Sequence, residues 1–145
     1  MLLHVVTPHI CVGPVWLGMT RDEARAAVPE PPTPFRKDAG EEYETDAFDT
    51  TGLHVYYAGP EPYVVFVEAF AAPGVAFDFL GMDPLALPAA TAIRLLRKIT
   101  RLIEDEPGSY LIENVDVALW RESESEPHFT ALSVGARGYF AAPAR

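Results

Sequence analysis

The sequence contains a single cysteine, Cys11, and no uninterrupted apolar run of about 20 residues. One cysteine cannot form a disulfide within the chain, and its scarcity agrees with a reducing compartment. Without a long apolar run, no transmembrane helix is expected. The first residues show neither the basic segment nor the extended apolar segment of a signal peptide. We therefore expect a cytoplasmic protein that does not contact a membrane.

Basic residues are also scarce. The chain has 11 Lys and Arg against 21 Asp and Glu, so its formal net charge is −10 at pH 7. Nucleic-acid binding needs Lys and Arg to replace the counterions on phosphates, so this charge disfavours nucleic acid as a partner. It favours a basic protein partner, which an acidic surface would attract. The alternative is that the charge serves only solubility.

The residue patterns of common catalytic sites are missing. The four histidines do not have the spacing of a zinc site, and no serine lies in a G-x-S-x-G turn. Cys11 lies near His9, but it sits in an apolar run that favours a buried, structural thiol. We therefore expect no catalytic set, no metal and no cofactor. The histidines are His4, His9, His54 and His128.

Two similar openings organise the chain. The first, Leu17 to Thr20, precedes a helix predicted over 21–28, where Thr20 and Glu23 form the T-x-x-E capping box. The second, Leu80 to Asp83, precedes a short turn over 84–87 and a longer helix predicted over about 89–103. The acidic run 104–106 is expected to end that helix. The echo suggests two pseudo-repeats, over residues 12–72 and 75–140.

The remaining segments read mainly as short strands joined by hairpins. No long βαβ alternation is present, so the expected fold is α+β, with a mainly antiparallel sheet, two helices on one face, and one domain over 1–145. The segment 41–48 is either a polar strand or a loop. Residues 135–138 should bend or bulge a strand, and 141–145 should form a frayed tail. The expected strands are 2–6, 10–12, 15–17, 35–37, 53–57, 63–70, 75–80, 110–112, 115–120 and 129–134.

The stretch from Val12 to Glu23 resembles the L-G-M-T-x-x-E opening of two kinds of small bacterial domain. These are the SmpA/OmlA lipoproteins and the β-lactamase-inhibitor proteins. The resemblance implies helices paired with an antiparallel sheet, with two tandem copies in the inhibitor type. It also implies that the concave side of the sheet binds other proteins. No binding residue is carried over from these families.

Aromatic residues close to carboxylates form the first candidate site. Aromatic anchors inside an acidic rim suit a basic protein partner, such as the target of an immunity-type or inhibitor protein. The alternative is that these aromatic residues belong to the core and the sheet edges, beside a solvated acidic face. The candidate residues are Glu41, Glu42, Tyr43, Glu44, Asp46, Tyr56, Trp120, Glu122 and Glu124.

Two other functions stay open. A pocket between sheet and helices could bind a small ligand or support catalysis, using His54, Glu68, Trp120 and Arg137. Glu68 lies within an apolar strand, so we expect it to be exposed at an edge, paired with a basic side chain, for example an arginine of the second helix, or functional. The third possibility is a structural homodimer joined through an exposed strand edge.

Overall fold

The computed structural model describes residues 1–140, which form two helices and twelve strands. The tail predicted at 141–145 lies outside these residues. The helices are α1 (Arg21–Ala27) and α2 (Ala89–Arg97). The strands are β1 (Leu2–Thr7), β2 (Cys11–Val12), β3 (Val15–Trp16), β4 (Thr33–Phe35), β5 (Thr45–Phe48), β6 (Leu53–Ala58), β7 (Tyr63–Phe70), β8 (Val75–Asp78), β9 (Leu102–Glu106), β10 (Ser109–Ile112), β11 (Val117–Trp120) and β12 (Ala131–Gly135).

The strands form two sheets. The larger has eight strands in the order β4-β5-β6-β7-β12-β11-β10-β9, and every neighbouring pair is antiparallel. The smaller has the order β3-β2-β1-β8, in which β1 and β8 run parallel. With two helices added, this confirms the predicted α+β class and its mainly antiparallel sheet.

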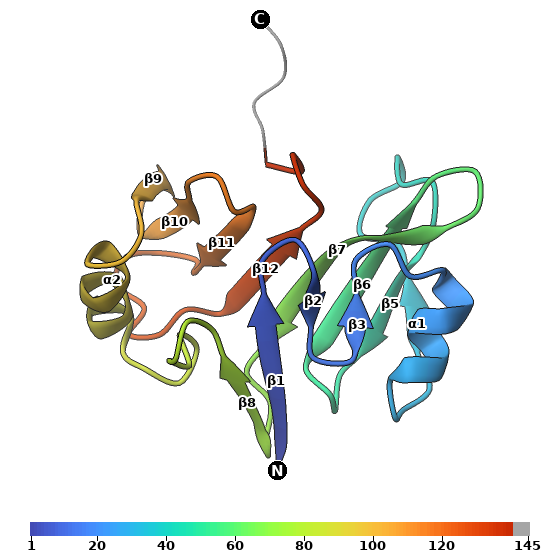
Figure 1. Ribbon diagram of the computed structural model, residues 1–145, viewed down its shortest axis with the longest axis horizontal. Helices are drawn as coiled ribbons and strands as arrows, with labels where there is room; N and C mark the ends of the chain where they lie inside the picture. The colour runs from blue at the N-terminus through green and yellow to red at the C-terminus, as the bar shows by residue number, and fades with distance from the viewer. Residues whose placement is uncertain (141–145) are drawn as a thin grey trace, which may run out of the picture.

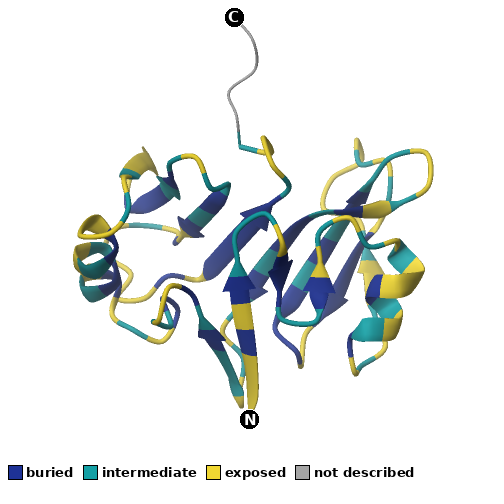
Figure 2. Ribbon diagram, viewed as in Figure 1, coloured by how far each residue is buried: buried dark blue, intermediate teal, exposed yellow. Residues whose placement is uncertain are grey.

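The small sheet and both helices lie on one side of the large sheet (Figure 1). Buried side chains from the small sheet, the helices and the large sheet form one apolar cluster between them. Along β1, buried and exposed residues alternate, because successive side chains of a strand point to opposite faces (Figure 2). We call the face of the large sheet that meets this cluster the inner face, and the opposite one the outer face.

The start of α1 is as predicted. The Glu23 amide donates to Thr20 Oγ1 at 3.1 Å, and the Thr20 amide donates to Glu23 Oε1 at 3.0 Å, which completes the capping box. The helix is one residue shorter than expected, because Val28 has extended backbone angles before Pro29. Gly18, with φ +90°, makes the turn into the helix.

The second opening, unlike the first, does not lead directly into a helix. Leu80 and Gly81 both have positive φ and make a tight turn between Phe79 and Met82. Asp83 then caps a short turn through its carboxylate, which accepts from the Leu85 and Ala86 amides at 3.0 and 3.1 Å.

Helix α2 begins at Ala89 as expected, but it ends at Arg97, so the prediction of a helix to about residue 103 was wrong. Thr100 turns its hydroxyl back onto the Leu96 carbonyl. Leu102 and Ile103 then belong to β9 and pair with Ile112 and Leu111. The acidic residues 104–106 consequently lie on the free edge of the large sheet rather than at a helix end.

Both halves of the chain contribute a helix followed by four antiparallel strands. The first half supplies α1 and β4–β7, the second supplies α2 and β9–β12, and β7 pairs with β12 to join the two sets. This order of elements is what a tandem would produce. Descent from a duplication stays a prediction.

Strand β5 was foreseen only as a polar strand or loop, yet all four of its residues are buried. Asp46 is fully buried, and its carboxylate accepts from the Arg25 guanidinium at 2.8 and 2.9 Å and from the Tyr57 hydroxyl at 2.7 Å. Burial and the hydrogen bond to Asp46 raise the pKa of Tyr57, so this hydroxyl stays a donor. The prediction that Asp46 contributes to a partner surface is therefore wrong.

The Asp46 interaction gives a test of stability. Replacing Asp46 with Ala should lower the free energy of unfolding by about 3 kcal/mol, because Arg25 and Tyr57 lose their shared acceptor inside the fold. Urea unfolding at pH 7 measures this change. The matched control is Glu44→Ala in the same segment, where the exposed side chain should change stability by less than about 0.5 kcal/mol. Equal effects of the two substitutions would contradict the structural role of Asp46.

Candidate functional site

The outer face of the large sheet is not covered by a helix anywhere in residues 1–140. Strand pairing determines which side chains it presents. His54 on β6 lies opposite Glu68 on β7, and Glu68 lies opposite Ser133 on β12. Residues directly opposite in an antiparallel pair point to the same face, so these three share the outer face.

The strand at the middle of this face carries only small outward side chains. Those of β12 are Ala131, Ser133 and Gly135, which lie opposite the larger Phe70, Glu68 and Phe66 of β7. Because Ala131 is small, Trp120 on β11 and Phe70 on β7 both lie over the same part of the sheet. The small side chains of Ala131 and Ser133 therefore leave space between β7 and β11, whereas Tyr139 covers Gly135.

A hollow of about 270 Å³ lies on the outer face at this point, and we call it the central hollow. It brings together side chains from β4 to β11 that are far apart in the sequence. Most of them are aromatic, and Trp120 is 42% exposed. The lining residues are Phe35, Lys37, His54, Tyr56, Glu68, Phe70 and Trp120.

Glu68 is the carboxylate at the floor of the central hollow, with only 15% of its side chain exposed. Its carboxylate accepts a hydrogen bond from the Tyr56 hydroxyl. It also forms an ion pair with Lys37, in which Nζ lies 3.3 Å from Glu68 Oε1. Burial and the neighbouring Glu68 carboxylate raise the pKa of Tyr56, so its hydroxyl stays protonated and donates. Glu68 is therefore paired, which was one of the predicted alternatives, but its partner is Lys37 and not an arginine of the second helix.

The imidazole of His54 packs between two aromatic rings. Its centroid lies 4.6 Å from that of Phe70 and 5.3 Å from that of Phe35. Its Nε2 lies 3.4 Å from the exposed carboxylate of Asp49, which keeps the ring oriented. His54 therefore forms part of an aromatic wall beside Glu68.

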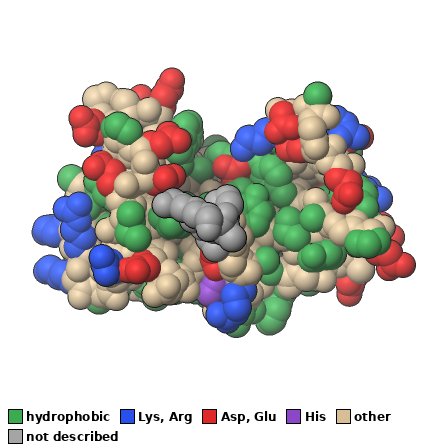
Figure 3. All heavy atoms as spheres, turned by 90° about the horizontal axis from the view of Figure 1, so that it is seen from above, with side chains coloured by type: hydrophobic (Ala, Val, Ile, Leu, Met, Phe, Trp, Pro, Cys, Tyr) green, Lys and Arg blue, Asp and Glu red, His purple; other side chains and the backbone are tan. Residues whose placement is uncertain are grey.

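A second, larger hollow of about 470 Å³ continues from the central hollow and shares Lys37 and Tyr56 with it. Three acidic residues, Asp38, Glu41 and Glu42, line it together with Tyr43. The Tyr43 hydroxyl donates to the Gly59 carbonyl, which fixes the ring. In Figure 3 the molecular outline shows a broad notch between two projecting ends that carry charged side chains.

The predicted site residues are distributed unevenly. Three of the four proposed for a ligand pocket, His54, Glu68 and Trp120, do line one hollow, but it opens on the outer face rather than between sheet and helices. Arg137 lines a different hollow, so the predicted four-residue pocket is wrong in this respect. Of the predicted partner-binding residues, Glu41, Glu42, Tyr43, Tyr56 and Trp120 line the two connected hollows.

The other predicted residues lie apart from these hollows. Glu44 is exposed in the loop before β5, and Glu122 and Glu124 are exposed in the loop between β11 and β12. The sequence did not indicate Phe35, Lys37 and Phe70 as site residues. Phe70 could have been found, because it alternates with Glu68 on the same strand, whereas Lys37 follows a three-residue edge strand that gives little signal.

Comparison of the chain with protein-family models, with curated proteins and with solved structures finds no match. The resemblance of the first opening to the lipoprotein and inhibitor families therefore stays a prediction.

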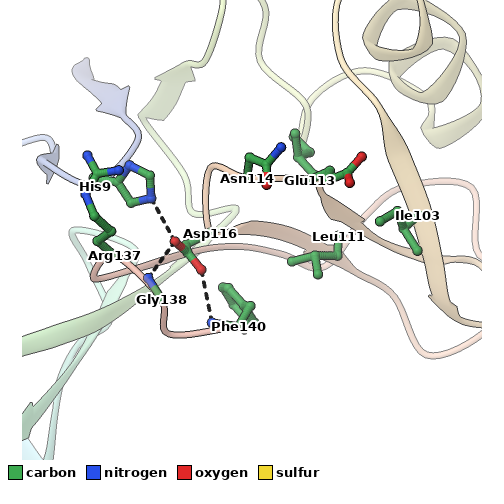
Figure 4. A pocket seen from close by; sticks show the side chains of 10 residues that line it. His9, Ile103, Leu111, Glu113, Asn114, Asp116, Arg137, Gly138 and Phe140 are labelled. Atoms are coloured by element: carbon green, nitrogen blue, oxygen red, sulfur yellow. Dashed lines mark hydrogen bonds and ion pairs between the residues drawn. The ribbon is translucent and has the colours of Figure 1, made fainter. Parts of the chain in front are cut away.

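A third hollow, of about 300 Å³, contains Arg137 and a tightly bonded carboxylate (Figure 4). Asp116 accepts from His9 Nε2 at 2.7 Å and from the amides of Gly138 and Phe140 at 2.9 and 3.1 Å. His9 therefore faces Asp116, whereas Cys11 is buried and points its Sγ at the Val5 carbonyl. Asp116 ties the segment after β12 to the turn after β1.

Three residues at the third hollow have left-handed backbone angles that side chains rarely adopt. They are His9, Asn114 and Asp116, with φ of 63°, 69° and 53°. Such conformations persist only where the surroundings hold them. The three hydrogen bonds of the Asp116 carboxylate hold the His9 ring and the backbone amides of Gly138 and Phe140. They place Tyr139 over Phe66, with ring centroids 4.5 Å apart, at the upper end of the outer face.

Burial raises the pKa of Asp116, but the Gly138 and Phe140 amides and His9 outweigh it, so the net pKa is lowered. A carboxyl whose pKa is lower in the folded state stabilises the fold fully above its unfolded pKa. That stabilisation is lost as the pH falls through the folded pKa.

The stability of the protein should therefore decrease below about pH 4, partly through Asp116. In the variant Asp116→Asn this part of the acid dependence should be absent, and stability at pH 7 should fall by about 2 kcal/mol because a charged acceptor is lost. Urea unfolding between pH 3 and pH 7 measures both effects. Asp105→Asn, at an exposed position of β9, is the control and should keep the wild-type profile. An unchanged profile in Asp116→Asn would refute this assignment.

Residues 1–140 contain neither a cluster of metal ligands nor a helix that could span a membrane. No group of three or more His, Cys, Asp or Glu side chains in this part of the chain is placed to hold a metal ion. Neither described helix has the length and apolar character needed to cross a membrane.

Proposed function

We propose that the protein is a non-catalytic protein-binding domain that holds its partner against the outer face of the eight-stranded sheet. The observation that supports this most directly is the group of aromatic side chains on that face, which no helix of residues 1–140 covers and in which Trp120 is 42% exposed. Aromatic residues that stay partly exposed in a hollow are typical anchors of protein interfaces. The rigid sheet places them without a large ordering cost.

The charge around this face favours a basic partner. Asp38, Glu41 and Glu42 line the second hollow, and the whole chain has a net charge of −10. Four of the 11 basic side chains lie within 94–101, on and just after α2, which packs on the opposite side of the sheet. Acidic groups at the rim would speed the approach of a basic protein and select for it.

The two tryptophans of the chain give a matched test. Trp120→Ala should weaken capture of a partner from a lysate of the source cells by about tenfold or more, because it removes the central anchor. Trp16→Ala removes a tryptophan of comparable exposure, 51% against 42%, from the small sheet and should leave capture unchanged. Quantitative mass spectrometry of captured proteins at low and high salt measures the difference. A capture profile that is the same for both variants would refute the proposal.

A second candidate function is self-association through the small sheet. Leu3, Val5 and Trp16 point away from the core and are 60%, 50% and 51% exposed. Within β1, β2, β3 and β8, Asp78 is the charged residue that shares this face. Exposed apolar surface of this kind commonly marks an interface. Two acidic chains could meet here without bringing many carboxylates together.

Sedimentation velocity tests this second candidate. If it is correct, the wild type should sediment as a dimer at high concentration, and Val5→Glu should sediment as a monomer because it places a charge in the contact. Ala26→Glu adds the same charge at an exposed position of α1 and should stay dimeric. A wild type that stays monomeric over the whole concentration range would exclude a dimer.

A further inference from the structure

The central hollow combines one carboxylate with a wall of aromatic side chains. Glu68 lies at its floor, and the rings around it are those of Phe35, His54, Tyr56, Phe70 and Trp120. The face of an aromatic ring attracts a cation, and a carboxylate at the same point adds a direct ionic contact. This combination is the chemistry that recognises a positively charged side chain.

Lys37 shows where such a cation fits. Its Nζ lies 5.3 Å from the centre of the Tyr56 ring, 3.3 Å from Glu68 Oε1 and 3.2 Å from the Tyr56 hydroxyl oxygen. Because Tyr56 donates its proton to Glu68, its oxygen is free to accept from Lys37. A primary ammonium at this position therefore makes an ionic contact with Glu68 and a hydrogen bond with the Tyr56 hydroxyl at once, beside the ring of Tyr56.

We propose that the central hollow is a receptor for the ammonium group of a lysine side chain from the partner, and that Lys37 occupies it in the free protein. This inference depends on the proposed function for the existence of a partner. It adds the chemical group that the partner inserts and the residues that receive it. A primary ammonium fits better than a quaternary one, since a quaternary ammonium has no N–H to donate to Glu68 or Tyr56.

Lys37 is well suited to give way to a partner. Its side chain is 55% exposed, and it lies in the turn that follows β4. Ion pairs at such exposed positions contribute little, so displacing Lys37 should cost the partner less than about tenfold in affinity. Glu68 stays paired throughout, because the incoming ammonium takes the place of the departing one.

The test uses n-butylammonium as the probe, which reproduces the end of a lysine side chain. The indole N–H signal of Trp120 in ¹H–¹⁵N NMR reports binding, and Trp16→Phe identifies which of the two indole signals it is. In Lys37→Ala the signal should shift and saturate, with a Kd at least about fivefold lower than in the wild type, because the internal competitor is gone. Arg36→Ala removes the adjacent cation, which does not line the hollow, and should behave as the wild type.

Glu68 supplies the ionic contact with the bound ammonium group. Adding Glu68→Gln to Lys37→Ala should weaken butylammonium binding by about tenfold or more. If that variant does not fold, Tyr56→Phe in the same background keeps the test and should weaken binding by about threefold through the loss of one hydrogen bond. Tetramethylammonium should bind more weakly than butylammonium, and n-butanol should cause no saturable shift.

Three results would contradict the proposal that the central hollow binds an ammonium group. They are the absence of a saturable shift in Lys37→Ala, an equal response to n-butanol, and tighter binding of tetramethylammonium than of butylammonium. These outcomes are separable from the fate of the proposed function. If butylammonium fails while Trp120→Ala still loses the partner, only the lysine assignment is wrong. If butylammonium binds while Trp120→Ala keeps the partner, the protein-binding proposal is wrong and the partner's lysine with it, whereas the ammonium site itself is supported.

Discussion

The pairing of β7 with β12 is the contact that the rest of the structure depends on. It joins two sets of four strands, which are far apart in the sequence, into one sheet through five residue pairs. On the inner side of this pair, Val67, Leu132 and Val134 are fully buried in the core. On the outer side the same strands present Glu68 beside Ser133. A single strand pair therefore closes the core and builds the floor of the candidate site, so the stability of the fold and the shape of the site are coupled.

Much of the local structure could be predicted from the sequence. The T-x-x-E spacing indicates the capped start of α1, and the apolar alternation indicates the hairpin of β6 and β7. That hairpin also places His54 and Glu68 on one face. The end of α2 could not be predicted, because Leu102 and Ile103 fit an apolar helix stripe as well as a strand, and pairing with β10 decides between them.

The candidate site itself could be predicted only in part. Trp120 reaches the central hollow because β11, β12 and β7 are neighbours, and no local pattern specifies that order. Lys37 reaches it from a turn. Asp46 was misassigned for a related reason: its acidic neighbours suggest a solvated segment, whereas Arg25 of a helix and Tyr57 of the next strand allow it to be buried. In each case the deciding contact joins residues that sequence spacing cannot relate.

The small outward residues of β12 limit how this face can change. A side chain at Gly135 would place its Cβ 2.5 Å from that of Tyr139, and larger residues at Ala131 or Ser133 would fill the space between β7 and β11. Larger side chains along this strand would therefore fill the depression. Substitutions at the borders, such as the acidic loop before β5, would leave its shape intact. The binding specificity of such a chain can therefore change through substitutions in the loops around the outer face, while the central strands of the sheet keep their residues.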